Sequence, residues 1–453
     1  MNHIIIIGGG VSGRLLALNL LHQAPFDASV HIQIVDRGDD EYMGPAYSND
    51  SPALLLNVSA EQMGAFSEEP EHFYRWARDR NGHIEPGDFL PRGLFREYIF
   101  SQINSIRGAR EDNVVLEHIS GEVTDVQLNG GRAIVHLENG EQLPADKVIL
   151  ALGNFPPRPI SIAHPSTFQS DRFIGNPWDA GVFDSLASRK SVVFIGTGQT
   201  MVDLSLILQK QGHEGDLTAI SRRGLLPLAH RNPEPYPSFF KEIDDSGNLL
   251  HLYQTVRKHL DEAAQLGLNE QAVIDSLRPY TQALWSNLPE VEKRRFMRHV
   301  FRYWERIRSR IPPENEELID NLRSQGQLRI VAGRVNDLVE TRNGIEVHYI
   351  SRQGQTQEIV QADYVVNCIG PETDYRRINH PLIKNLLRRG VISPGPANIG
   401  IKANPDGAIV SDAGDPSEVL HTLGATMKGL YWEVIAVPDI REQAENLAPT
   451  LLG

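Results

Sequence analysis

Three glycines near the N-terminus have the spacing of a loop that binds phosphate. Gly8, Gly10 and Gly13 follow four consecutive isoleucines and precede an apolar segment, which predicts a buried strand, a tight turn and a helix. The first glycine permits the turn, the second lets a pyrophosphate approach the backbone, and the third lets the helix lie close to the strand. Asp36 ends the next predicted strand, where its carboxylate can accept hydrogen bonds from an adenosine ribose. The expected chemistry is dinucleotide binding at a helix N-terminus.

A second, looser copy of this pattern begins at residue 191. Gly196 and Gly198 follow another predicted strand, whereas Met201 stands where the third glycine would be. Each copy continues with an alternating stretch and a late strand that ends in glycine, at Gly153 and at Gly370. We interpret these two glycines as points where the chain passes a bound dinucleotide, with a simple turn as the alternative. The duplication predicts two dinucleotide-binding domains in one chain.

The two copies differ at the position where such a domain selects its ligand. In the first copy, Asp36 suits the free ribose hydroxyls of FAD or NAD. In the second copy the equivalent strand ends in Ser221, and Arg222 and Arg223 place cations where an acid would reject a 2′-phosphate. We therefore expect FAD in the first copy and NADPH in the second. The alternative is that the two arginines belong to an ordinary surface loop.

The composition is typical of a globular enzyme with more than one domain. The chain has 453 residues, of which 40% are hydrophobic and 23% are charged, and this length exceeds that of a single ordinary core. A formal charge of −14 argues against nucleic acid as a partner, because phosphate backbones require a basic surface. No apolar run is long enough to span a membrane, so we expect a cytoplasmic protein.

The available side chains exclude several kinds of reactive centre. Cys368 is the only cysteine, which excludes a disulfide framework, a CxxC pair and hence a disulfide reductase. Because it lies in an alternating apolar strand, we expect a buried, unreactive thiol. His230 and His299 lack the spacing of metal ligands, so no metal site is expected. A hydrolase nucleophile would stand on a glycine-flanked elbow, and the sequence has none.

These motifs predict an α/β fold with two Rossmann-like, three-layer dinucleotide-binding domains, the second inserted into the first. We expect the FAD-binding domain over residues 1–157 and 371–453. The NAD(P)-binding domain is expected over residues 158–370, with a helical insert at about 228–326. Hinge candidates lie where the chain crosses between the domains: Pro156, Pro157, Pro159 and Pro371.

The insert contains a strongly basic segment. Residues 292–310 predict one amphipathic helix. Arginines recur at intervals of four on one face: Arg294, Arg298, Arg302 and Arg306. Like charges at this spacing repel, so this stripe should meet acids or phosphate. The nearby acids in the sequence are Glu234, Glu242, Asp244 and Asp245. The alternative is that the stripe attracts an anionic substrate or NADPH.

Several further strings resemble the FAD/NAD(P)-binding family of bacterial flavoproteins, which includes N-hydroxylase-like and urate hydroxylase-like flavin-dependent monooxygenases. These strings are residues 44–47 with 55–58, Arg92 with Tyr98, residues 221–227, and residues 429–433 with 436–441. The resemblance covers nearly the whole chain, and the C-terminal string is its most specific part. It implies that the N-terminal motif binds FAD, that the C-terminal segment caps it, and that NAD(P)H enters from the inserted domain.

The resemblance also implies roles for particular residues. Asn57 would lie beside the flavin and is the catalytic candidate, and Val123 would offer backbone groups to the adenine. Many flavoproteins with two dinucleotides have an acid after the glycine of the last FAD strand. Here Ala425 follows Gly424, so we expect backbone amides to contact the flavin there. Glu433 and the nearby Asp439 would lie near the flavin ring, with ordinary helix packing as the alternative.

The complete set of candidate residues follows from these two arguments. The candidates for FAD binding are Gly8, Gly10, Ser12, Gly13, Asp36, Arg37, Asn57, Arg92, Val123, Gly153 and Gly424. The candidates for NADPH binding are Gly196, Gly198, Gln199, Thr200, Ser221, Arg222 and Arg223.

FAD beside a nicotinamide site implies hydride transfer from NADPH to the flavin. Because the chain has no cysteine pair and no iron–sulfur motif, molecular oxygen is the expected acceptor, which predicts a monooxygenase acting through a flavin hydroperoxide. The insert is expected to exclude water from this site. The resemblance and the arginines together predict a small polar nitrogenous substrate: an amine, an amino acid or a purine such as urate. The alternatives are an NAD(P)H-dependent reductase that passes electrons to a quinone or a protein, and a binding protein that senses dinucleotides.

Overall fold

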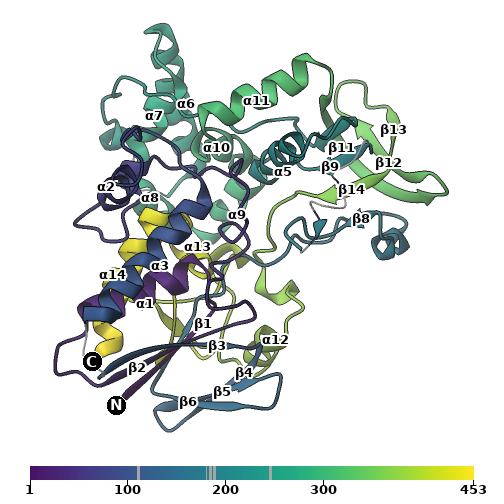
Figure 1. Cartoon of the computed structure of the whole chain (residues 1–453). Coiled ribbons are helices and arrows are strands. Elements are labelled where there is room, and N and C mark those ends of the chain that lie inside the picture. The colour runs from purple at the N-terminus through teal and green to yellow at the C-terminus, as the bar shows by residue number, and fades with distance from the viewer. Residues whose placement is uncertain (110–112, 180, 183–185, 187–189, 244–246) are drawn as a thin grey trace.

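The computed structural model describes residues 1–109, 113–179, 181–182, 186, 190–243 and 247–453. Two largely parallel sheets lie in separate units, and a group of helices contacts both (Figure 1). We call the part built on the six-stranded sheet the first unit and the part built on the seven-stranded sheet the second unit. The insert consists of helices α6 to α10, which lie between two strands of the second unit.

The sheet of the first unit has the strand order β15-β16-β7-β1-β2-β3. Its strands are β1 (Asn2–Ile7), β2 (Val30–Asp36), β3 (Val114–Ser120), β7 (Lys147–Leu150), β15 (Ala408–Val410) and β16 (Pro416–Thr422). Neighbouring strands pair in parallel except for β15 and β16. Segments from the two ends of the chain therefore share one sheet, as expected for a first domain that a second one interrupts.

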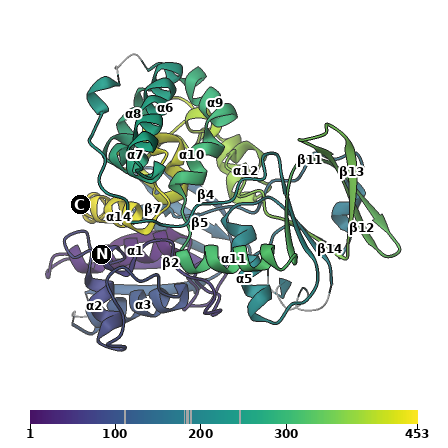
Figure 2. The same ribbon diagram turned by 90° about the horizontal axis from the view of Figure 1, so that it is seen from above.

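The isoleucines of β1 lie between two covering layers. Ile4 and Ile6 face one hydrophobic core, whereas Ile5 and Ile7 face another. The first layer contains α1 (Val11–Gln23), α3 (Arg92–Ala109) and α14 (Val437–Leu452), and the second contains β4 (Val123–Asn129), β5 (Arg132–Leu137), β6 (Gln142–Ala145) and α12 (Pro381–Arg388). Successive side chains of a strand point to opposite faces, so a strand buried on both sides is apolar throughout. Figures 1 and 2 show α1 and α14 side by side in the first layer.

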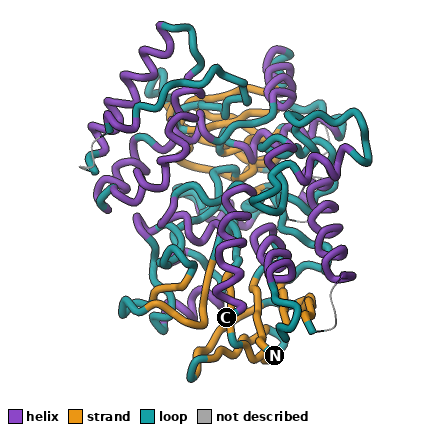
Figure 3. Tube along the Cα trace, turned by 90° about the vertical axis from the view of Figure 1, so that its left-hand side faces the viewer, coloured by secondary structure: helices purple, strands orange, loops and turns teal. Residues whose placement is uncertain are grey.

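The two ends of the chain lie together at one end of the first unit (Figure 3). The side-chain nitrogen of Asn2 donates to the carbonyl of Leu451 at 2.9 Å. Helix α14 thus fastens the C-terminus beside the strand that begins the fold.

The sheet of the second unit has the order β13-β12-β11-β10-β9-β14-β8. Its strands are β8 (Phe173–Ile174), β9 (Val192–Ile195), β10 (Leu217–Ser221), β11 (Leu328–Thr341), β12 (Gly344–Ser351), β13 (Gln357–Ala362) and β14 (Tyr364–Asn367). Strands β8 to β11 and β14 pair in parallel, while β11, β12 and β13 form an antiparallel meander. Helices α5 (Gln199–Lys210) and α11 (Pro313–Ser324) contribute to the core of this unit. The fold class expected from the sequence, with two Rossmann-like units and a helical insertion, is confirmed.

The insert differs from the prediction at its basic segment. Its helices are α6 (Leu249–Gln265), α7 (Glu270–Leu277), α8 (Thr281–Asn287), α9 (Glu290–His299) and α10 (Phe301–Arg308). The single helix predicted over residues 292–310 is wrong, because the chain breaks at Val300 and forms α9 and α10 instead. The rings of Phe296 and Phe301 both contact Trp432. In an unbroken helix, residues five apart point about 140° away from each other, so the break lets both rings reach one partner.

The two crossings between the units lie side by side. Pro157 and Pro371 form an isolated antiparallel bridge, and the amide of Glu372 donates to the carbonyl of Pro156 at 3.1 Å. The side chain of Asn367 donates to the carbonyl of Arg158 at 3.0 Å. These contacts are where the sequence placed its hinge candidates, and the boundaries of 157 and 370 remain predictions.

Candidate functional site

The first glycine loop passes tightly over a neighbouring strand and leaves one side open. Gly8 has a φ of +114°, and a Cβ atom there would lie 2.4 Å from the carbonyl oxygen of Ala151. A Cβ atom on Gly13 would lie 2.0 Å from the carbonyl oxygen of Gly8. At Gly10, the residue before α1, a Cβ atom would meet nothing nearer than the carbonyl oxygen of Met43 at 4.0 Å. The loop therefore offers exposed backbone and a helix N-terminus to a ligand at Gly10.

The second loop repeats this geometry in the second unit. Gly196 has a φ of +126°, and a Cβ atom there would lie 2.3 Å from the carbonyl oxygen of Cys368. Gly198 precedes α5 and has nothing within 4 Å of its Cβ position. Cys368 is buried, and burial raises the pKa of its thiol. Its carbonyl rather than its sulfur therefore faces the loop, in agreement with the expected unreactive thiol.

Asp36 is held in place at the end of β2. One carboxylate oxygen accepts from the amide of Gly9 at 2.7 Å, and the other accepts from the amide of Gly38 at 2.9 Å. The sequence analysis missed Arg14, whose buried guanidinium donates to the carbonyls of Gly9 and Asp40 at 3.3 and 2.6 Å. Arg14 thereby ties the loop after β2 to α1, and a cation directly after the third glycine was its only signal in the sequence.

Arg37 and Val123 lie at one rim of the first unit. The exposed side chain of Arg37 pairs through Nε with Glu122 at 2.8 Å, and Glu122 also contacts His380. Val123 follows Glu122, begins β4 and is buried. The structure thus brings these two FAD candidates close together, with Arg37 paired to an acid of the chain itself.

Gly424 brings the C-terminal segment, which we define as residues 424–453, to the first loop. Its φ is +74°, and a Cβ atom would lie 2.5 Å from the hydroxyl oxygen of Ser12. The amide of Gly424 donates to Oε1 of Gln443 at 2.8 Å. The Gly424 amide thus already has an acceptor within the chain, and the contact of backbone amides in this stretch with the flavin remains a prediction. Gly153, after β7, has a φ of +62° and open space at its Cβ position.

Asn57 and Arg92 lie where the first unit meets the rest of the chain. The carbonyl of Asn57 accepts from Nε2 of His230, in the insert's first connection, at 2.9 Å. Burial lowers the pKa of His230 to about 4, so the imidazole is neutral at pH 7. Arg92 was expected to contact FAD, but its guanidinium donates to the carbonyl of Leu55 and to Asp203 of α5, at 2.9 and 3.0 Å. The structure therefore gives Arg92 an interdomain contact.

The NADPH candidates surround the second loop. The hydroxyls of Thr197 and Ser221 lie 2.9 Å apart, and the amide of Gly224 donates to Ser221 at 3.0 Å. The side chain of Gln199 donates to the carbonyl of Arg310 at 2.9 Å. Thr200 lies in the first turn of α5 and is half-buried. Hydroxyl contacts thus fix the segment that carries Arg222 and Arg223, and a side chain of the loop reaches the end of the insert.

The basic stripe finds acids other than the expected ones. Its ion pairs are Arg294 with Glu290 at 3.6 Å, Arg302 with Glu305 at 2.6 Å and Arg306 with Glu270 at 3.3 Å. Of the acids expected to pair with the stripe, Glu242 pairs with Lys258 at 2.9 Å instead. Asp244 and Asp245 lie outside the described residues. The stripe thus meets acids, as expected. Those that the structure describes differ from the named ones, because α7 packs against α10 and the other acids lie three or four residues away on the same helices.

The comparisons with known proteins agree with this geometry. Residues 5–155 match a family model described as FAD-NAD(P)-binding. The N-terminal part of the first unit is an FAD/NAD(P)-binding domain. No curated protein sequence matches the chain.

Solved structures share the fold of the entire chain. An ornithine hydroxylase from Pseudomonas aeruginosa is 15% identical, with a TM-score of 0.66 and coverage of 100% of this chain and 99% of the other. An ornithine N-hydroxylase from Kutzneria sp. 744, with reduced FAD, NADP⁺ and L-ornithine, is 14% identical, with a TM-score of 0.66 and coverage of 100% and 99%. A cadaverine monooxygenase from Erwinia amylovora bound to FAD is 13% identical, with a TM-score of 0.65 and coverage of 99% and 94%.

The insert docks on the C-terminal segment, beside the FAD/NAD(P)-binding domain. Trp432 stacks on Trp285 of α8 with 4.6 Å between ring centroids, and Nε1 of Trp285 donates to the carbonyl of Gly429 at 2.8 Å. Trp432 has a φ of 67° and a ψ of −59°, and the amide of Glu433 donates to the carbonyl of Tyr431 at 2.8 Å. This is the rarer, strained form of γ-turn. The aromatic contacts hold the chain in that conformation.

The strained turn presents Glu433 to α10. Glu433 accepts from Nε and Nη2 of Arg308 at 3.0 and 2.9 Å. Asp439 lies at the start of α14, and burial raises its pKa to about 6. The charge of Arg308 opposes this shift, whereas the charge of Glu433 adds to it. For Glu433 the structure favours the packing alternative, because its carboxylate fastens the insert to the segment.

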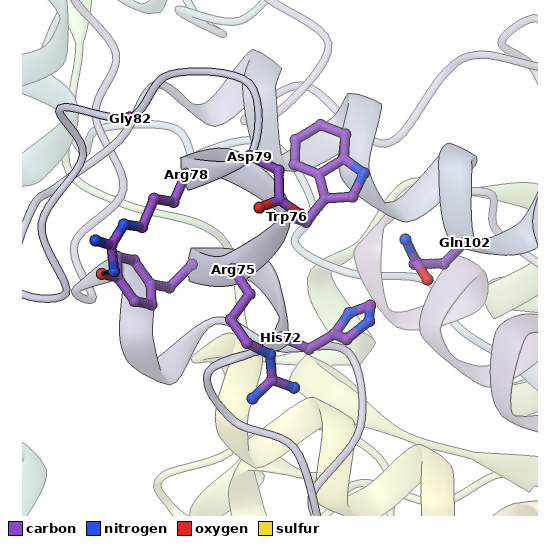
Figure 4. A pocket seen from close by; sticks show the side chains of 8 residues that line it. His72, Arg75, Trp76, Arg78, Asp79, Gly82 and Gln102 are labelled. Carbon is purple, nitrogen blue, oxygen red and sulfur yellow. Dashed lines mark hydrogen bonds between the residues drawn. The ribbon is translucent and has the colours of Figure 1, made fainter.

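Neither described cavity contains a candidate cofactor residue. A groove of about 690 Å³ opens beside α2 (His72–Arg78), from which His72, Arg75 and Trp76 project (Figure 4). Nη1 of Arg78 donates to the hydroxyl of Tyr74 at 2.9 Å. A smaller cavity of about 110 Å³ lies between α14 and the loop before β15. In the described part of the chain, no helix is long and apolar enough to cross a bilayer, and no three His, Cys, Asp or Glu side chains are grouped to hold a metal ion.

Proposed function

We propose that this protein is an FAD-dependent monooxygenase that consumes NADPH and hydroxylates a small amine or amino acid. The observation that carries the proposal is the equivalence of the two loops: Gly8 and Gly196 both have a positive φ and pass over the carbonyl that ends a late strand. Two such loops allow one chain to hold two dinucleotides. The amine-hydroxylating enzymes of similar fold support FAD and NADPH as the pair.

The residues of the first loop fit the FAD pyrophosphate. Gly10 faces open space at the N-terminus of α1, where backbone N–H groups and the helix dipole favour phosphate. Asp36 would accept a hydrogen bond from the ribose, because its oxygens are oriented by two amides and keep further lone pairs. When bound, FAD supplies the redox chemistry, taking a hydride from NADPH and reducing oxygen.

The insert would exclude water from the space between the two dinucleotides. Its contacts with the C-terminal segment include a stacked tryptophan pair and the Arg308–Glu433 ion pair. Asn57 would lie beside the flavin, and its backbone carbonyl accepts a hydrogen bond from the neutral His230. A site that excludes water would favour oxygen transfer to a substrate, so this arrangement of the insert suits a monooxygenase.

The substrate class rests on the proteins of similar fold, which are named for ornithine and cadaverine. Both compounds carry primary amines on flexible chains. The purified yellow protein should be mixed with NADPH in air and offered amines, amino acids and purines. We expect an amine to accelerate NADPH oxidation and to yield a product that gains one oxygen atom.

Two other outcomes would replace this proposal. NADPH oxidation without oxygen, supported by a quinone or an artificial acceptor and giving no hydroxylated product, would identify a reductase. A flavin that NADPH fails to bleach at a useful rate would identify a dinucleotide-binding protein without this activity. A hydroxylated purine would retain the reaction type and change the substrate class.

A further inference from the structure

Arginines from four separate segments gather at the end of β10. Arg222 and Arg223 follow Ser221, the last residue of this strand. Ser221 is in register with Ala332 of β11, which places Arg334 just beyond on the neighbouring strand. Arg223 lies over the ring of Tyr303 in α10, at 4.9 Å from the centroid. Arg158 of the first crossing and Arg302 of α10 also act on Arg222.

The charges of this cluster act on one another. Burial lowers the pKa of Arg222, and the next causes are the charges of Arg302, Arg223, Arg158 and Arg334. The backbone of Arg158 is fixed beside the end of β14, because its carbonyl accepts from the side chain of Asn367 at 3.0 Å. These five arginines therefore share one small region, and we call them the arginine cluster.

Few acidic side chains balance the positive charges of the arginine cluster. Arg302 pairs with Glu305 at 2.6 Å, and Arg223 has the ring of Tyr303. Over the residues that the structure describes, no carboxylate forms an ion pair with Arg158, Arg222 or Arg334. Arg158, Arg222 and Arg334 are exposed. Neighbouring cations without acids repel one another, and an anion with several negative oxygens relieves that repulsion. The location beside the second loop identifies the anion as part of a nucleotide.

We propose that the arginine cluster binds a phosphate group of the pyridine dinucleotide, and that Arg302 of α10 brings the insert into this site. The inference rests on the proposed function in one respect, namely that the second loop holds NADPH. It adds that the nucleotide site is shared between the second unit and the insert, whereas Arg222 and Arg223 alone would confine it to the second unit.

A shared site has a structural consequence, because α10 also contacts the first unit. Phe301 lies edge-on to Trp432 at 5.4 Å between centroids, and Arg308 pairs with Glu433. Arg302 is on the same two-turn helix. A phosphate bound at Arg302 would therefore stabilise the insert where it closes against the C-terminal segment.

The test compares Arg302→Ala with Arg295→Ala in the FAD-loaded protein. The control is closely matched, since Arg295 of α9 also pairs with a glutamate three residues away, at 2.5 Å, but it is exposed and outside the cluster. Binding of NADPH, NADH and 2′,5′-ADP is measured by calorimetry. We expect Arg302→Ala to weaken NADPH binding by about tenfold to a hundredfold, the usual effect of losing a charge-assisted hydrogen bond. Arg302→Lys should recover part of the loss, and Arg295→Ala should bind as the unmodified protein does.

Comparison of the three ligands shows which phosphate group Arg302 contacts and, if the test fails, which of the two proposals is wrong. Weaker binding of NADPH and 2′,5′-ADP, but not of NADH, assigns Arg302 to the 2′-phosphate. An equal loss for NADPH and NADH assigns it to the pyrophosphate. Unchanged binding of all three by a folded Arg302→Ala variant overturns the inference and leaves the proposed function intact. If the unmodified protein binds neither NADPH nor 2′,5′-ADP, the proposed use of NADPH fails as well.

Discussion

Arg92 and Asp203 form a buried ion pair that joins the two dinucleotide-binding units, with 3.0 Å between Nη2 and Oδ1. Arg92 begins α3 of the first unit, and Asp203 lies in α5 directly behind the second loop. Burial raises the pKa of Asp203, and the charge of Arg92 opposes that shift. The ion pair therefore connects α3 of the first unit with α5, the helix that follows the second loop.

Replacing one residue of this ion pair should lower the free energy of unfolding more than replacing both residues. We expect Arg92→Met to lower the free energy of unfolding by about 3–5 kcal/mol, because it leaves an uncompensated buried carboxylate. The double variant Arg92→Met/Asp203→Leu should regain most of this loss. Urea unfolding of the single and double variants measures the difference. Additive losses in the double variant would show that the two side chains do not act as a pair.

The glycine at the start of α1 should be intolerant of a side chain. In Gly13→Ala the new Cβ would lie 2.0 Å from the carbonyl oxygen of Gly8 and 3.2 Å from a methyl carbon of Ile6. The loop must shift, so we expect a destabilisation of about 1–3 kcal/mol and loss of bound FAD. Gly87→Ala is the control, because nothing lies within 4 Å of its Cβ position. The flavin absorbance of each purified protein is the measurement, and a fully yellow Gly13→Ala protein would contradict the assignment of the first loop.

The arginines at the end of β10 should set the preference between nucleotides. Replacing Arg222 and Arg223 together with alanine should raise the KM for NADPH by about tenfold to a hundredfold, the effect of losing charge-assisted hydrogen bonds to phosphate. The KM for NADH should change little, since NADH lacks the 2′-phosphate. Steady-state NAD(P)H oxidation measures both constants. A parallel change for the two nucleotides would place these arginines elsewhere on the ligand.

The sequence predicted the parts of the structure that depend on local patterns. Four isoleucines and three glycines specify a strand, a turn and a helix, and both copies of this pattern fold as expected. Contacts between distant segments could not be predicted in this way. The rings on either side of the break at Val300 contact Trp432, more than a hundred residues later, and Arg92 pairs with Asp203, also more than a hundred residues away. No periodicity in a single sequence records such pairs.

His230 should make stability depend on pH. Its pKa in the folded protein, about 4, lies below the ordinary 6.5, so the unfolded chain binds more protons between these values. Its contribution to stability is therefore present above pH 6.5 and is lost as the pH falls toward 4, by up to about 3 kcal/mol. Asp439 acts in the opposite sense, because its raised pKa favours the folded state at lower pH.

The comparison that isolates His230 is therefore between variants. Unfolding of the unmodified protein and of His230→Gln should be measured from pH 7.5 to about pH 4.5, the range that brackets most of this titration. The difference in the free energy of unfolding between the two proteins should shrink as the pH falls. Only the unmodified protein loses the contribution that His230 makes to stability. The exposed His83→Gln variant serves as the control. A constant difference across this range would mean that His230 does not titrate as its burial requires.

The tryptophan pair should couple NADPH oxidation to oxygen transfer. Trp285→Phe keeps an aromatic ring against Trp432 but loses the hydrogen bond to the carbonyl of Gly429, which should cost about 1 kcal/mol of stability. Trp285→Ala also removes the ring, and a loss of about 3–5 kcal/mol is expected from the cavity. The insert would then close less firmly on the C-terminal segment, so water would reach the flavin and more NADPH would be consumed per product. The ratio of hydrogen peroxide to hydroxylated product measures this leak. If Trp285→Ala is folded and remains as tightly coupled as Trp285→Phe, the insert does not exclude water through this contact.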